Sequence, residues 1–354
     1  MITTDCLHVI CPHLDLHTIL ALLWSCQGIR SQIKEIQPRI HDNVLFRLHE
    51  PSPQSLWKHI QLETISIQFQ TYAKCGVWSP HTLLIAYSCH KVIYIWSKVT
   101  HQLVSTLKNL NDIQTLAWSS DGSLLASGSN DHAIVIWSGS SIKHRLCGHN
   151  KTVYSVAWSA DNTKLVSGST DGKVCLWDMT TGSLSQVWKR EDEDTLSMVS
   201  ISSDGSVVAI ASLQSTSYLW HTSTGVTHVL PRTNEWLSSM TFSPDNTRVV
   251  FGYDTGLIRI YHVHTPSLLL SIEPESTLHR YNCLTAFNPD GSKIIRRHRD
   301  LTILDANTGI RLKTMNPTQA SDIDCVLDLQ WSSNCISVLT AKINKIISLT
   351  TYYE

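Results

Sequence analysis

Few side chains in this chain have types and a spacing that could support chemistry. Among the 18 histidines, His262 and His264 come closest to a metal-binding pair, two apart on a presumed strand end. Zinc sites take three or four protein ligands, so this pair alone does not predict one. Gly-x-Ser-x-Gly, a glycine-rich phosphate loop and His-Glu-x-x-His are all missing. We therefore expect no catalytic residue, no metal and no cofactor, and a protein that is not an enzyme. A catalytic site assembled from distant parts of the chain is the alternative, which no motif supports.

Two runs of like charge stand out against a balanced background. One is acidic (Glu191 to Asp194), and the other is basic (Arg296, Arg297, His298 and Arg299). The whole chain has 28 basic and 29 acidic residues, which argues against a dedicated nucleic-acid binder. We expect the acidic run to lie in a connection between repeats and the basic run in a turn before the last strand of a later repeat. Both would help to bind a partner, or would be solvated loops without one.

The composition also bears on the compartment. No apolar run approaches the length that spans a membrane, and polar residues such as Asp5 and His8 interrupt the N-terminus where a secretory signal would be apolar. The 10 cysteines form no Cys-x-x-Cys pair. Such isolated cysteines are typical of small core residues in a reducing compartment. We expect a protein of the cytoplasm or the nucleus, or both, with neither a membrane nor a nucleic-acid partner.

The elements that would position any site come from a repeat. A phrase built on Trp-Ser-x-Asp-Gly, an apolar strand and a strand ending in Trp returns about every 40 residues. This period, made of short strands, is typical of a propeller of four-stranded blades. Asp-Gly or Asp-Asn pairs supply the tight turns between strands. We call the position of the final Trp of this phrase the closing position of a repeat. Seven closing positions predict seven blades: Trp96, Trp137, Trp177, Trp220, Tyr261, Leu304 and Leu349.

The repeats resemble the WD40 family over residues 62–354. His149, Ser167, Asp171 and Trp177 stand at the spacing of the family's structural tetrad. The resemblance implies an all-β, seven-bladed WD40 β-propeller in which these four residues form buried hydrogen bonds and have no catalytic role. We also expect the ring to be closed from its N-terminal side, with the alternating stretch Leu62 to Phe69 serving as the outer strand of the last blade.

Before the repeats, the apolar spacing changes to a helical one. Leu7, Ile10, Leu14 and Asp15 are followed by the apolar pair Leu20 and Leu23, and then by Ser25-Cys26 and Ile29-Arg30. This order, over residues 2–36, resembles an F-box, the helical module that docks on the Skp-type adaptor of a cullin ubiquitin ligase, although Ile2-Thr3 replaces the family's opening Leu-Pro. We expect an F-box-like helical module at 1–38, a connecting segment at 39–61 and the propeller at 62–354. The alternative is that the helices only cap the propeller. The residues expected to contact the adaptor are Ile2, Leu7, Ile10, Leu14, Leu20, Leu23 and Ile29.

Together, the two resemblances imply a substrate-recognition subunit of a cullin-type (SCF) ubiquitin ligase. Its partners would be a Skp-type adaptor with its cullin complex, and a target protein. The alternative is a WD40 interaction scaffold without a ubiquitin connection. The residues expected to bind the target are Lys74, Tyr154, Trp236, Arg297 and Arg299. Of the equivalent inner-strand positions (Lys74, Gln114, Tyr154, Ser197, Ser238, Cys283 and Leu327), Lys74 alone is basic, which argues against a pocket of several arginines for phosphate.

Overall fold

The computed structural model describes residues 61–68, 73–80, 82, 84–100, 102–189, 195–212, 216–274, 282–298, 300–315, 325–331, 335–341 and 346–353. The chain divides into two compact units, Met1–Lys58 and His59–Glu354, and all described residues belong to the second. The helical module expected at 1–38 and its adaptor-binding residues therefore lie outside the described part of the chain.

The described residues form seven four-stranded antiparallel sheets. The first contains β2 (Cys75–Trp78), β3 (Leu84–Cys89), β4 (Val92–Ser97) and β5 (Gln102–Lys108). The second contains β6 (Ile113–Trp118), β7 (Leu124–Ser129), β8 (Ala133–Ser138) and β9 (Ser141–Cys147). The third contains β10 (Val153–Trp158), β11 (Lys164–Ser169), β12 (Lys173–Asp178) and β13 (Ser183–Lys189). The fourth contains β14 (Leu196–Ile201), β15 (Val207–Ser212), β16 (Ser217–His221) and β17 (Thr227–Val229). The fifth contains β18 (Leu237–Phe242), β19 (Arg248–Tyr253), β20 (Ile258–His262) and β21 (Leu268–Ile272). The sixth contains β22 (Leu284–Phe287), β23 (Lys293–Arg297), β24 (Leu301–Asp305) and β25 (Arg311–Met315). The seventh contains β26 (Cys325–Trp331), β27 (Cys335–Ala341), β28 (Ile346–Tyr353) and β1 (Gln61–Gln68).

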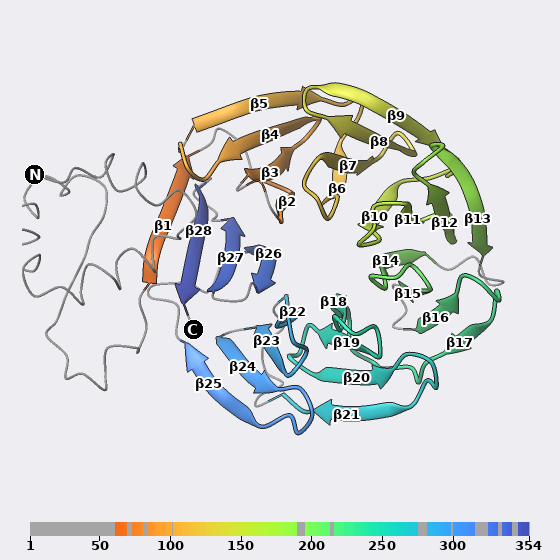
Figure 1. Ribbon diagram of the computed structural model, residues 1–354, viewed down its shortest axis with the longest axis vertical. Helices are drawn as coiled ribbons and strands as arrows, with labels where there is room; N and C mark the ends of the chain where they lie inside the picture. Colours follow the sequence, from red (N-terminus) through yellow and green to blue (C-terminus); the bar gives the residue numbers. More distant parts are fainter. Residues whose placement is uncertain are drawn as a thin grey trace, which may run out of the picture. The chain divides into compact units, whose positions relative to one another are not determined.

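These sheets are arranged as the blades of a propeller (Figure 1). The first strand of each sheet lies innermost and contacts the first strand of the next sheet around the ring. Strand β26 of the seventh sheet contacts β2 of the first, so the ring is closed. The predicted all-β architecture of seven four-stranded blades is therefore confirmed for the described residues.

Ring closure also follows the prediction, because β1 pairs antiparallel with β28 and completes the seventh sheet. Ile65 lies opposite Leu349 and Ile67 opposite Ile347. The strand covers an edge of β28 that would otherwise expose unpaired backbone groups.

The closing position predicted in the last blade, Leu349, is wrong by three residues. In the other sheets the closing residue lies opposite the second residue of the second strand, as Trp177 lies opposite Leu165. The corresponding residue of β27 is Ile336, and its partner is Tyr352, whereas Leu349 lies opposite Leu339. Strand β28 has eight residues, whereas the equivalent strand β12 has six. The repeat period therefore placed the closing position three residues too early.

The second strand of each sheet explains why the blades must stack. All six residues of β15 are buried, because one face packs on the preceding sheet and the other on the following sheet. Gly168 of β11 permits this close approach: a Cβ added there would lie 2.8 Å from Cγ1 of Val199 in the next sheet. The apolar repeat is therefore buried between sheets rather than within one of them.

The predicted tight turns are present at the left-handed positions. Gly122 and Asn162 have φ values of 70° and 59°. Where asparagine replaces glycine, its side chain joins two sheets, since the Ser120 backbone N–H donates to Oδ1 of Asn162 at 2.7 Å. Asn246 repeats the arrangement by accepting from the Ser203 N–H at 2.8 Å.

Candidate functional site

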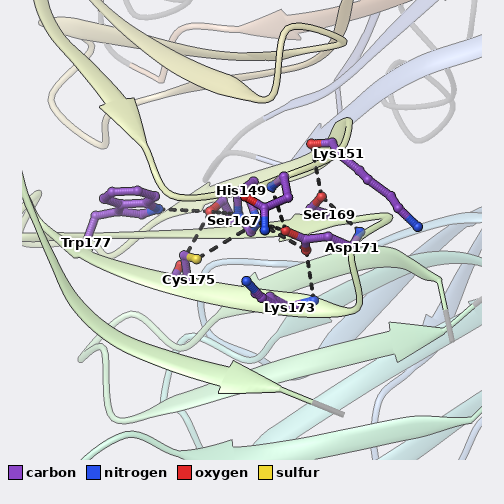
Figure 2. Close-up of polar contacts among 9 residues, drawn as sticks. His149, Lys151, Ser167, Ser169, Asp171, Lys173, Cys175 and Trp177 are labelled. Carbon is purple, nitrogen blue, oxygen red and sulfur yellow. Dashed lines mark hydrogen bonds and ion pairs between the residues drawn. The ribbon is translucent and has the colours of Figure 1, made fainter. Parts of the chain in front are cut away.

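The third sheet contains a continuous chain of buried hydrogen bonds (Figure 2). The indole Nε1–H of Trp177 donates to Oγ of Ser167 at 2.8 Å, and this hydroxyl lies 2.8 Å from Nε2 of His149. Nδ1 of His149 lies 3.3 Å from both carboxylate oxygens of Asp171. The structure thus brings together the four residues expected to form the tetrad, three on β11, β12 and the turn between them and one on the loop before β10.

The carboxylate of Asp171 can only accept hydrogen bonds, so Nδ1 of His149 is the donor in this pair. Burial would raise the pKa of Asp171, but hydrogen bonds from His149 and from the backbone N–H groups of Asn150 and Lys173 hold it at about 2. These hydrogen bonds satisfy buried polar groups between strands, which is a structural role.

The other sheets replace parts of this chain. In the second sheet, Trp137 donates to Ser127 at 2.9 Å, but Asn109 stands where histidine would be. Its Nδ2 is buried without a hydrogen-bond partner, and Asp131 pairs instead with Arg145 at 2.8 Å.

In two other sheets, larger side chains occupy the position that Ser127 and Ser167 hold in the second and third sheets. In the first sheet, Tyr87 accepts from the indole of Trp96 at 3.3 Å. In the fifth, Phe251 packs edge-on against Tyr261 with ring centroids 5.7 Å apart.

A second candidate feature is the face on which the chain enters the inner strands. Each sheet repeats the same strand order, so residues that open the inner strands share this face. Lys74 is exposed just before β2, Tyr154 is 46% exposed in β10, and Trp236 is 65% exposed just before β18. We call these three residues, with Leu110, the entry face.

Leu110 was missed by the sequence analysis. It lies in the loop before β6 and is 71% exposed. No pattern in the sequence distinguishes it from a buried leucine.

Tyr154 owes its exposure to a β-bulge. The register of β10 against β11 shifts between Val153 and Ser155, leaving Tyr154 as the extra residue. The same shift recurs at the equivalent residues Gln114, Ser197, Ser238 and Leu327.

The structure corrects the expectation for the basic run. Arg296 and Arg297 do not lie in a turn: they end β23, and they are 9% and 7% exposed. Nη1 of Arg296 donates to the Gly256 carbonyl at 3.3 Å. Because both neighbouring sheets cover the second strand of a blade, Arg297 is not presented as a surface charge for a target. Arg299 and the acidic run Glu191 to Asp194 lie outside the described residues.

Arg297 is instead connected to Trp236 through hydrogen bonds. Nη1 of Arg297 donates to the His298 carbonyl at 3.0 Å, and Nε2 of His298 lies 2.9 Å from the Asp254 carbonyl. Asp254 in turn accepts the Trp236 backbone N–H at 3.1 Å and donates its own N–H to the Trp236 carbonyl at 2.8 Å. Burial lowers the pKa of His298, and the nearby Arg296 and Arg297 add to this effect, although its bond to Asp254 opposes it. The network holds an exposed indole on a fixed loop.

Reactive side chains are not gathered into a site in the described ranges. No group of three His, Cys, Asp or Glu side chains is arranged there to hold a metal ion. Cys175 and Cys283 are buried, and burial raises the pKa of each thiol to about 12, so neither is activated as a nucleophile. Among the same residues, no helix is long and apolar enough to cross a membrane.

Comparison with known families identifies the repeats. Residues 101–138 and 140–178 match the family model of the WD domain, G-beta repeat. Each match begins with the outer strand of one sheet, β5 or β9, and ends with the third strand of the next. A comparison with curated proteins finds no match. The chain therefore contains WD40 repeats, which are typical of scaffolds for protein interactions.

Proposed function

We propose that this protein is the substrate-recognition subunit of a cullin-type (SCF) ubiquitin ligase and is not itself an enzyme. In this proposal the propeller captures a target protein on its entry face, and the N-terminal 38 residues dock on the Skp-type adaptor. The observation that carries the first half is the exposed indole of Trp236 on a loop anchored by Asp254.

Several properties of the entry face support target binding. Tryptophan and tyrosine supply large contact areas at low entropic cost and often dominate interfaces. The indole of Trp236 is 65% exposed, so this side chain is not needed for the stacking of the blades. Lys74 adds a positive charge, and Leu110 adds apolar area. An extended segment with apolar and acidic side chains would complement this surface.

The adaptor half of the proposal is supported by the sequence pattern ahead of the propeller. Leu7, Ile10, Leu14, Leu20 and Leu23 provide more apolar surface than three short helices can bury among themselves. Large apolar patches of this kind usually mark an interface.

Purified full-length protein and a Skp-type adaptor test this half. Leu14→Asp would place an uncompensated charge in the contact and cost roughly 3–5 kcal/mol of binding free energy. Leu269→Asp, on the exposed outer strand β21, is a matched control that should bind the adaptor normally. Unchanged binding by a folded Leu14→Asp variant would favour the alternative, a WD40 scaffold without a ubiquitin connection.

Target binding by the propeller is tested with a second variant and its matched control. Trp236→Ala should weaken target capture, whereas Val99→Ala should not, although the two side chains are 65% and 67% exposed. Val99 lies in the turn between β4 and β5, at the end of its sheet opposite the entry face. His298→Ala, which removes a bond that positions Asp254, should weaken capture less than Trp236→Ala. Retention of the complete set of captured proteins by Trp236→Ala would place the binding face elsewhere.

A further inference from the structure

Three histidines gather where the fourth and fifth sheets meet, outside the entry face. His221 ends β16 and His228 lies in β17, whereas His264 lies in the turn between β20 and β21. The ring centroid of His221 lies 5.5 Å from that of His228 and 6.1 Å from that of His264. Figure 1 shows β16 and β17 in the sheet next to that of β20. We call these three residues the histidine cluster.

The segments that carry the histidine cluster contain no acidic residue and no Lys or Arg. Residues 217–231 include β16, β17 and the turn between them, and none of the four charged residue types occurs there. The same holds for residues 260–272, which run from β20 to the end of β21. Strand β15 places the apolar Val207 opposite His221. An imidazolium formed here would therefore have other imidazoles as neighbours and no carboxylate of these segments to pair with.

The charged side chains of the neighbouring strands and turns are bound elsewhere. Arg248 of β19 lies opposite His262, whose ring is 6.1 Å from that of His264. Its guanidinium donates to groups in the turns of the sixth sheet. Asp204 and Asp245, in the first turns of the fourth and fifth sheets, each accept hydroxyl and N–H groups of their own turn. None of these side chains is positioned by a printed contact to offset a charge in the cluster.

The central side chain of the cluster is held in place by its turn. The His221 N–H donates to the Val226 carbonyl at 2.8 Å, and the His221 carbonyl accepts the Gly225 N–H at 2.8 Å. Nε2 of His221 is buried and has no hydrogen-bond partner within the described part of the chain. Burial lowers the pKa of His221, and the nearby His228 and His264 add to this effect. The folded protein therefore favours the neutral imidazole.

We propose that the histidine cluster is an acid-sensitive contact between the fourth and fifth blades, closed at neutral pH and loosened when its imidazoles are protonated. Like charges on rings 5.5 and 6.1 Å apart repel one another, and burial strengthens that repulsion. A histidine that binds its proton less tightly in the folded than in the unfolded chain contributes stability that is lost as pH falls below about 6.5. The junction is therefore most stable near neutral pH and weakens in mildly acidic solution.

Loosening should begin at the outer strands. Strand β17 has three residues and pairs with β16 at three positions, whereas the outer strand β13 of the preceding sheet has seven residues. The inner strands β14 and β18 contact each other around the ring and contain no histidine. Protonation thus acts on the outer part of the junction, at the end of the sheets away from the entry face, and is independent of what the entry face binds.

The test compares thermal unfolding of the full-length protein at pH 7.5 and 5.5 with that of His221→Gln and His264→Gln, which keep a polar side chain but cannot be protonated. On going from pH 7.5 to 5.5, the fall in Tm should be smaller in each variant than in the unchanged protein, by roughly 2 °C or more. His144→Gln changes a histidine of β9 that is half-buried like His221, and this matched control should follow the unchanged protein.

Hydrogen exchange tests the same contact without a substitution. After correction for the intrinsic effect of pH on amide exchange, protection in β17 and β21 should drop at pH 5.5 relative to that in β5, an outer strand without histidine. Unchanged relative protection would overturn the proposal. So would an equal fall in Tm in the unchanged protein and in either variant. A His144→Gln control that loses the pH dependence to the same extent would also overturn it, because the titration would then belong to histidines in general.

Discussion

The carboxylate of Asp328 in β26 accepts the backbone N–H of Trp78 in β2 at 3.0 Å, across the junction where the last sheet meets the first. The two residues are 250 positions apart in the sequence. Asp328 also accepts the Leu329 N–H at 2.8 Å. In the third and fifth sheets the equivalent residue is a serine: Ser155 accepts the Val199 N–H at 3.1 Å, and Ser239 donates to the Cys283 carbonyl at 2.8 Å. The ring junction therefore uses a carboxylate where these two junctions use hydroxyls.

Asp328 should make the stability of the ring depend on pH. Burial raises the pKa of Asp328 to about 6, although the Trp78 and Leu329 N–H groups act in the opposite direction. A carboxyl whose pKa is higher in the folded than in the unfolded chain binds its proton more tightly when folded. The ionised carboxylate therefore destabilises the folded ring above about pH 6, and this cost declines as pH falls towards 4. When pH is lowered from 7.5 to 4.5, the difference in free energy of unfolding between the unchanged protein and Asp328→Asn should change by about 1–3 kcal/mol in favour of the unchanged protein. Denaturant unfolding at both pH values checks this, and an identical difference at both would refute it.

Asp171 should show the opposite sign at lower pH. Its pKa of about 2 lies below the usual value of a free aspartate, so the ionised form stabilises the folded state. This contribution is complete above about pH 4 and is lost as pH falls towards 2. Asp171→Asn should cost about 2 kcal/mol at pH 7 and less at pH 3. Unfolding curves for the two proteins that stay equally far apart at both pH values would exclude this role.

The second sheet offers a gain of stability. Asn109→His would place an imidazole between Ser127 and Asp131, where the third sheet has His149. The new side chain should satisfy a buried polar position and raise the free energy of unfolding by about 1 kcal/mol. Thermal unfolding measures it, and the gain should vanish in an Asp131→Ala background. A gain that survives there would have another origin than the tetrad.

The contribution of β1 can be measured by truncation. A chain that starts at residue 58 retains β1, whereas one that starts at residue 71 lacks it and leaves the edge of β28 unpaired. The shorter chain should melt roughly several degrees lower, since the loss of a strand costs more than one kcal/mol. Equal melting temperatures would show that β1 does not stabilise the ring.

The repeat explains which features the sequence could predict. Trp137 and Trp177 lie at the same position, one residue before the end of the third strand, in two sheets. The period and the strand type therefore define the blades and the tetrad of the third sheet. Arg297 was misplaced because a charged pair next to a turn usually is solvated, and nothing local indicates that the next sheet covers it.

The most direct test of the receptor proposal captures the full-length protein from cells and quantifies what accompanies it, comparing the unchanged chain with Leu14→Asp and Trp236→Ala. The account predicts that Leu14→Asp loses the Skp-type adaptor and the cullin but keeps the target, and that Trp236→Ala keeps the adaptor and loses the target. If both variants, each folded, keep the adaptor and the same set of other proteins as the unchanged chain, the account is contradicted.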